Sequence, residues 1–260
     1  MRGRTTQHPW SMRTTPGYNG RTVFTTRRST LVAAVAVWLW GVAPTPEAAG
    51  RVAPGERYGA LRPEVFDLAS RAVACAERAG VISQPSTLTV IDYSRPSSER
   101  RLWTIDLDRQ ALVHEELVSH GKGSGDLYAE RFSNTEGSYQ TSLGLFVTGE
   151  TYVGQNGYSL RLDGVEPGLN DQARARAIVM HGAPYVSDTF VAGTGRLGRS
   201  LGCPAVRTEI AKSLIDRIKG GNVLFAYGDD AEWLKTSAYL GTCTAALHPG
   251  FAQLLRGPQR

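Results

Sequence analysis

The sequence predicts a mainly β domain with flanking helices, one before the domain and one inserted late in it. Seven short runs rich in β-branched, aliphatic or aromatic residues are separated by Gly, Pro, Asn and Asp, as expected for strands joined by turns. These runs span 87–93, 101–108, 111–121, 142–154, 158–164, 176–182 and 222–228. Two other stretches instead carry apolar residues at helical spacing.

The two helices are predicted over 63–80 and 207–221. Pro63 suits a first helical turn, and Gly80 is a typical end signal. The later stretch ends at a glycine pair and has aliphatic residues on one face, namely Ile210, Leu214, Ile215 and Ile218. Between the strands, residues 170–177 are polar and are interpreted as a solvated turn or edge.

The first fifty residues have the pattern of an export signal. A basic stretch at 25–30 precedes an apolar run at 31–43, and small residues follow at 47–50. The run is shorter than the ~20 residues that cross a bilayer as a helix. We therefore expect export to the periplasm or cell envelope, by the general or the twin-arginine route. An uncleaved anchor remains an alternative, with membrane attachment through this segment only.

The net charge of +5 does not indicate a nucleic-acid partner. Six of the 29 basic residues, but only one of the 24 acidic residues, lie in the first fifty positions. The rest of the chain is balanced, which argues against a basic binding face.

We divide the chain into four parts. Residues 1–50 are a signal peptide or N-terminal extension, and 51–85 are a linker and the first helix. Residues 86–228 form the main domain, and 229–260 form a C-terminal segment.

Export changes the interpretation of the three cysteines, because disulfides persist outside the cytoplasm. Since three is odd, at most two can pair within the chain. A Cys75–Cys243 bond would join the ends of the domain and leave Cys203 free, and three separate thiols are the alternative. There is no Cys/His cluster at zinc spacing, so no structural metal is expected.

Two predicted strands end in His-Gly, at His120 and His181. Such an ending places an imidazole at the rim of a sheet, where sites commonly form. A free thiol such as Cys203 has a pKa of about 8.5, so it needs a nearby base to become a nucleophile. Backbone N–H groups at Leu201, Gly202 and Cys203 are candidates for an oxyanion hole. These residues predict an exported cysteine acyltransferase or hydrolase.

His181-Gly182, followed by Ser200-x-Gly202-Cys203 after 22 residues, resembles the signature of the L,D-transpeptidase catalytic domain. This family is also called YkuD-type, and the match is to its murein L,D-transpeptidase branch. The resemblance extends over roughly 61–228 through segments in the family's order, which are 119–125, 131–144, 149–164, 170–186 and 197–206.

The resemblance implies an L,D-transpeptidase-like β-sandwich or barrel that acts on peptidoglycan stem peptides without metal or organic cofactor. We also expect the protein to be a monomer. Cys203 would be the nucleophile, His181 the general base and then acid, and the Gly182 carbonyl would orient the imidazole. The loop 200–202 would shape the oxyanion hole. The acyl group would pass to an amine in 3–3 cross-linking.

Two departures from the family pattern concern substrate recognition. Leu201 and Ala205 stand where the family often has His and Arg. Arg199 is our first choice, over Arg196 and Arg207, to supply the missing charge. We also assign substrate binding to Tyr152 and to His120.

The alternatives for His120 are a structural role or a rival base. The glycine-rich segment 121–125 is interpreted as a flexible flap.

Two alternative functions share these residues. With water as acceptor, the protein would be an L,D-carboxypeptidase or amidohydrolase on stem peptides. A non-catalytic cell-wall-binding module is the other alternative, although the presence of both His181 and Cys203 argues against it.

Overall fold

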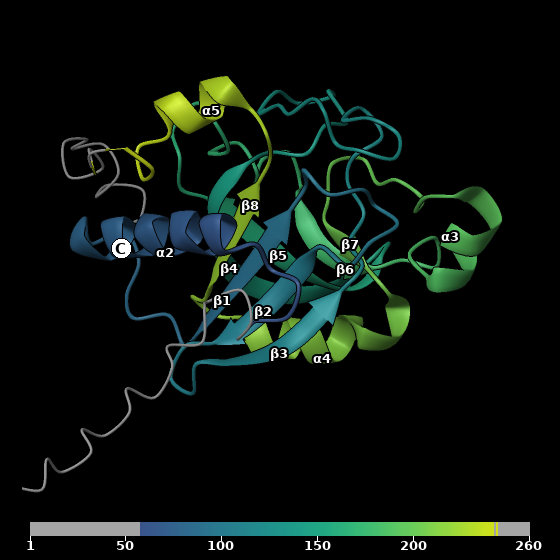
Figure 1. Ribbon diagram of the computed structural model, residues 1–260, viewed down its shortest axis with the longest axis horizontal. Helices are drawn as coiled ribbons and strands as arrows, with labels where there is room; N and C mark the ends of the chain where they lie inside the picture. Colours follow the sequence, from purple (N-terminus) through teal and green to yellow (C-terminus); the bar gives the residue numbers. More distant parts are fainter. Residues whose placement is uncertain (1–57, 242, 244–260) are drawn as a thin grey trace, which may run out of the picture. The chain divides into compact units, whose positions relative to one another are not determined.

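The computed structural model describes residues 58–241 and Cys243, and this part of the chain is built on one sheet (Figure 1). Eight strands pair in the order β3-β2-β1-β8-β4-β5-β6-β7. They are β1 (Thr87–Asp92), β2 (Leu102–Asp106), β3 (Ala111–Glu116), β4 (Gly144–Gly154), β5 (Gly157–Gly164), β6 (Val179–Gly182), β7 (Ala205–Val206) and β8 (Val223–Tyr227). Only β1 with β8 and β6 with β7 are parallel. The predicted mainly β class is confirmed.

The sheet curls until its two edges meet. β3 and β7 are the first and last strands of the sheet. Val118, just beyond β3, forms an antiparallel bridge with Val206 of β7. The backbone N–H of Ser119 also donates to the carbonyl of Ala205 over 2.8 Å. This contact nearly closes the sheet in the manner of a barrel, although β3 itself pairs only with β2 among the described strands.

The described residues contain α2 (Pro63–Arg78), α3 (Asp188–Thr194), α4 (Thr208–Ile218) and α5 (Ala231–Thr236). The helices predicted over 63–80 and 207–221 correspond to α2 and α4. Figure 1 shows both packed against the sheet. Their buried faces, which join one hydrophobic cluster with the strands, consist of Val65, Ala69, Ala72, Val73, Cys75 and Ala76 in α2 and Ala211, Leu214, Ile215 and Ile218 in α4. Each large aliphatic side chain buried there contributes about 1.5–3 kcal/mol.

The predicted export segment at 1–50 lies outside the described residues. Within the described part of the chain, no helix has the length and apolar composition needed to cross a membrane. The boundaries at 50, 85 and 228 stay predictions.

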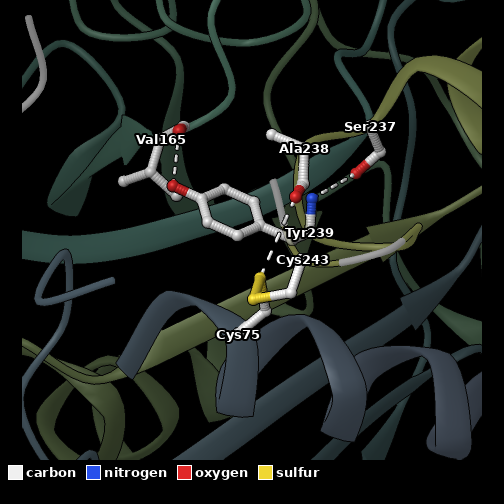
Figure 2. The surroundings of a disulfide bond; sticks show 6 residues. All are labelled: Cys75, Val165, Ser237, Ala238, Tyr239 and Cys243. Atoms are coloured by element: carbon white, nitrogen blue, oxygen red, sulfur yellow. Dashed lines mark hydrogen bonds between the residues drawn. A yellow bond between two sulfur atoms is a disulfide. The ribbon is translucent and has the colours of Figure 1, made fainter. Parts of the chain in front are cut away.

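Cys75 and Cys243 form a disulfide, with their Cα atoms 5.5 Å apart, so the predicted pairing is confirmed. The bond joins α2 to the segment after α5 (Figure 2). In the same segment, the Tyr239 hydroxyl donates to the Val165 carbonyl over 3.0 Å. Since the chain has three cysteines, Cys203 is its one free thiol.

Replacing both disulfide cysteines with serine is expected to lower the free energy of unfolding by about 2–5 kcal/mol, because the bond closes a long loop. The sequence separation is 168 residues. Denaturant unfolding midpoints measure the loss. Cys203→Ser is the matched control, since it leaves the bond intact and should unfold at the wild-type midpoint. A double variant as stable as wild type would contradict the prediction.

Candidate active site

The parallel pair β6 and β7 places the segment of Cys203 alongside the strand that carries His181. His181 lies opposite Ala205, and Cys203 precedes Ala205 by two residues. The Cys203 thiol lies beside Val179, which precedes His181 by two residues. The backbone N–H of Val179 donates to Sγ over 3.4 Å. Cys203 lies outside β7, and its sulfur contacts the backbone at the start of β6, the strand that carries His181.

The Cys203 thiol is half-buried, and its surroundings act on its pKa in opposite directions. Burial raises the pKa of the thiol, whereas the Val179 N–H and the positive charge of Arg176 lower it. The thiol donates to the Ala177 carbonyl over 3.6 Å. Because the balance is a raised pKa, the sulfur is protonated at neutral pH and needs a base to become a nucleophile.

His181 is held as a neutral imidazole with one nitrogen available. Its Nδ1 lies 2.9 Å from the Gly182 carbonyl. Since a carbonyl can only accept, Nδ1 carries the proton and Nε2 carries the lone pair. Burial lowers the pKa of His181 below its usual value. A Cβ on Gly182 would lie 3.0 Å from the Cβ of Ala211 in α4, so the glycine lets the helix pack close to the end of β6.

The turn before Cys203 is closed by Ser200. The Ser200 hydroxyl donates to the Cys203 carbonyl over 2.6 Å and accepts from the Gly202 N–H over 3.1 Å. Gly202 has φ +127°, which favours glycine. Of the predicted oxyanion donors, the Gly202 N–H is therefore already engaged. The Leu201 side chain is 59% exposed.

The segment 121–125 is a packed wall of the site, which corrects the expectation of a flexible flap. Gly121 bridges Ser200, and the Lys122 N–H donates to the Ser200 carbonyl over 2.8 Å. The Gly123 N–H donates to the Tyr139 carbonyl over 2.9 Å. A Cβ on Gly121 would lie 2.3 Å from that same carbonyl oxygen, so only glycine fits between the two loops.

His120 is fully buried, and both of its ring nitrogens are engaged. Nδ1 accepts from Arg101 Nη2 over 2.8 Å, because a guanidinium can only donate. Nε2 therefore carries the proton and donates to the Gly125 carbonyl over 3.3 Å. Arg101 also donates to the Val118 carbonyl and lies over the Tyr93 ring. This arrangement corresponds to the structural alternative, because the ring joins the end of one loop to the next and presents no free nitrogen to a ligand.

The stability of the fold is expected to fall in acid because His120 is buried in its neutral form. Burial, with a smaller effect from Arg101, lowers its pKa to about 3, whereas histidine in an unfolded chain has a pKa of about 6.5. The stabilisation is complete above pH 6.5 and is lost progressively as the pH falls towards 3. The pKa values of His114 and His181 are lowered too and add to the same trend.

Denaturant unfolding between pH 7.5 and 4.5 measures this effect. His120→Asn keeps an acceptor for the guanidinium but cannot take up a proton, so its stability should depend less on pH. A wild-type midpoint that is as high at pH 5 as at pH 7.5 would contradict the prediction.

The other two predicted substrate-binding residues are Arg199 and Tyr152. Arg199 Nη1 donates to the Gly125 carbonyl over 3.0 Å and pairs with Asp126 at 2.5 Å, so its charge is locally offset. Tyr152 in β4 is in register with Ser159 of β5, which is opposite His181. Tyr152 therefore shares the face of His181 from two strands away, or about 10 Å in a regular sheet. Both roles stay predictions.

Sequence reasoning missed Arg176, which lies in the stretch interpreted as a solvated turn. Its positive charge acts on the Cys203 thiol. The signal that could have found it is its position just before β6, since the start of β6 lies beside Cys203.

The closed sheet and the Cys203–His181 pair define a mainly β domain whose thiol and neutral imidazole are suited to acyl transfer. A family model for the L,D-transpeptidase catalytic domain (YkuD_2) matches residues 58–227, which is more than half of the chain. The chain belongs to this family, and the membership predicted from its motifs is confirmed. Among curated proteins, no match is found.

Several solved structures are similar to this chain. An L,D-transpeptidase from Mycobacterium smegmatis is 13% identical with a TM-score of 0.36, over 55% of this chain and 59% of that chain. One from Mycobacterium tuberculosis is 14% identical with a TM-score of 0.36, over 55% and 58%. A helical cell shape determining protein from Campylobacter jejuni is 13% identical with a TM-score of 0.38, over 67% and 55%. The chain thus spans less than two thirds of the length of each.

Proposed function

We propose that this chain is an exported peptidoglycan L,D-transpeptidase that cross-links stem peptides through a thioester on Cys203. Family membership supports L,D-transpeptidase activity and a peptidoglycan substrate. The observation that carries the thioester mechanism is the free thiol of Cys203 against the start of β6, the strand that carries neutral His181.

Export is supported by two independent features. Residues 1–50 have the pattern of a signal peptide. The Cys75–Cys243 disulfide is a bond that persists outside the cytoplasm. Fractionation of the producing cells, with the N-terminus of the envelope form read by mass spectrometry, tests both export and cleavage.

In the first half-reaction, the Nε2 lone pair of His181 takes the proton of the Cys203 thiol. The sulfur attacks the carbonyl of the diamino acid at stem position three, and the oxygen takes up the negative charge. When this intermediate collapses, the C–N bond breaks and D-Ala leaves with the proton returned by His181. The stem peptide remains as a thioester on Sγ.

In the second half-reaction, the amine of a neighbouring stem attacks the thioester carbonyl. His181 takes a proton from this amine, the C–S bond breaks, and the sulfur is reprotonated. The product is a 3–3 cross-linked dimer, and each proton taken by Nε2 is given back within the same half-reaction. The hydrogen bond from Nδ1 to the Gly182 carbonyl keeps the required nitrogen free throughout.

Mass spectrometry of stem peptides incubated with the purified protein tests this function. The expected product is a cross-linked dimer that has lost one D-Ala, with a thioester mass on the protein during turnover. Loss of D-Ala without dimers would overturn transpeptidation in favour of the L,D-carboxypeptidase. Unchanged peptides without an adduct would overturn both and leave the wall-binding module.

A further inference from the structure

The arginines that flank Cys203 in the sequence are already paired with carboxylates. Arg199 Nη1 lies 2.5 Å from Asp126 Oδ1, and Arg207 Nη2 lies 2.8 Å from Glu116 Oε1. These ion pairs offset their charges locally. A positive charge that acts on the Cys203 thiol therefore has to come from another part of the chain.

Arg176 is held in place entirely by neutral acceptors. Its Nη1 donates to the Ser133 carbonyl and to the Ser142 hydroxyl, both over 2.6 Å. Its Nη2 donates to the Gln140 carbonyl over 2.7 Å and to the Ser138 hydroxyl over 3.2 Å. Four hydrogen bonds fix the guanidinium, and since none of these partners is charged, its positive charge is not neutralised by them.

The guanidinium lies against the residue that precedes Cys203. A Cβ on Gly202 would be 3.6 Å from Arg176 Nη2 and 2.9 Å from the Gln140 carbonyl that Nη2 bonds. The residue after Arg176 touches the sulfur itself, since the Ala177 carbonyl lies 3.6 Å from Sγ. The fixed charge is therefore next to the thiol, where it lowers the pKa of the thiol against the effect of burial.

Two tyrosines interact electrostatically with the thiol, namely Tyr185, which follows β6, and Tyr93, which follows β1. His181 is the titratable group on β6, the strand that the sulfur contacts. Burial raises the pKa of both tyrosines and lowers the pKa of His181, so all three are neutral near pH 8. Among the described residues, Arg176 is thus the permanent charge that acts on this sulfur.

We propose that Arg176 is the fixed cation that stabilises the thiolate of Cys203, acting through the sulfur and not by contact with the substrate. The importance of this positioning residue for catalysis rests on the proposed function, whereas its effect on the sulfur does not. Since its four Nη hydrogen-bond donors are occupied by Ser133, Ser138, Gln140 and Ser142, the guanidinium serves as a local charge and not as a clamp for a substrate carboxylate.

The rate of alkylation of Cys203 by iodoacetamide, followed by intact mass as a function of pH, measures the thiolate fraction. The disulfide leaves Cys203 as the one thiol that reports. In Arg176→Gln the midpoint of the curve of alkylation rate against pH is expected to rise by about one pH unit or more. The reason is that an opposite charge within ~4–6 Å shifts a pKa by about 1–3 units. The alkylation rate at pH 7 should then fall about tenfold or more. An unchanged midpoint in folded Arg176→Gln would overturn the proposal.

The matched control is Arg174→Gln, which removes the same charge two residues away. Arg174 pairs with Glu150 and Asp163, so its loss should leave the midpoint unchanged. Arg176→Lys keeps a positive charge and should restore most of the wild-type midpoint. Equal rises of the alkylation midpoint in Arg174→Gln and Arg176→Gln would overturn the proposal. Such a result would reflect the net charge of the protein and not the position of Arg176 beside Cys203.

A second measurement needs no variant and therefore does not depend on how Arg176→Gln folds. The negatively charged reagent iodoacetate is attracted by a cation beside the sulfur, whereas iodoacetamide is neutral. At pH 8 the ratio of the two alkylation rates should be several-fold higher in the folded wild-type chain than in the same chain in urea. Equal ratios would overturn the proposal.

These readouts separate the two proposals. A protein that forms no cross-link would overturn the proposed function and leave the alkylation midpoints untouched. An unchanged midpoint would overturn the part played by Arg176 and leave cross-linking by Cys203 intact.

Discussion

Replacing Cys203 with alanine is expected to abolish acyl transfer, a loss on the order of 10⁴–10⁶-fold, because it removes the sulfur that would carry the acyl chain. The remaining cysteines, Cys75 and Cys243, are joined in the disulfide and cannot substitute. Cys203→Ser tests the chemistry with less change of shape. Its hydroxyl is far less acidic than a thiol, so we expect it to be inactive too.

A carbapenem, which the family resemblance predicts will acylate the nucleophile, gives the direct readout. Intact mass should show one adduct on the wild-type chain, mapped to the peptide that contains Cys203, and none on Cys203→Ala. Thermal unfolding of the variant near the wild-type temperature is the control for folding. Full activity or an adduct in Cys203→Ala would mean that the nucleophile lies elsewhere.

The elements that the sequence could predict are those whose signal is local. The strand runs and the two long helices are visible because burial imposes a period on the residues themselves. The strand β7 has only two residues and forms because β6 and Val118 pair with it on either side. Helix α3 buries no residue and so has no apolar stripe, although Ser187 caps its first turn by accepting from the Phe190 N–H over 3.1 Å.

The same distinction applies to the site. His181, Gly182 and Cys203 could be predicted because each lies in a short motif whose residue types carry the chemistry. Arg176 was not, because its acceptors come from the loop 133–142, more than thirty residues away in the sequence. A polar stretch with two arginines predicts solvation unless the tertiary partners are known. The pairing of Arg199 with Asp126 could not be predicted for the same reason, since only the fold brings the two residues together.

His181→Asn is expected to reduce the rate of acylation by about 10²–10⁴-fold while leaving the fold intact. An asparagine amide can occupy the position of Nδ1 and donate to the Gly182 carbonyl, which accepts from the imidazole over 2.9 Å. It has nothing at the position of Nε2 to take the proton from Cys203. The decrease in acylation rate would therefore measure the contribution of the base at Nε2 while the orienting hydrogen bond to Gly182 is kept.

The pH dependence of kcat/KM distinguishes loss of the base from a general disturbance of the site. Because burial lowers the pKa of His181, protonation should inactivate the wild-type enzyme only below pH 6.5. In His181→Asn this acidic limb should disappear, since no imidazole remains there to titrate. His114→Asn is the matched control, because this histidine lies on β3, away from the thiol, and its loss should leave the limb in place. An acidic limb that survives unchanged in His181→Asn would assign the titrating base to another residue.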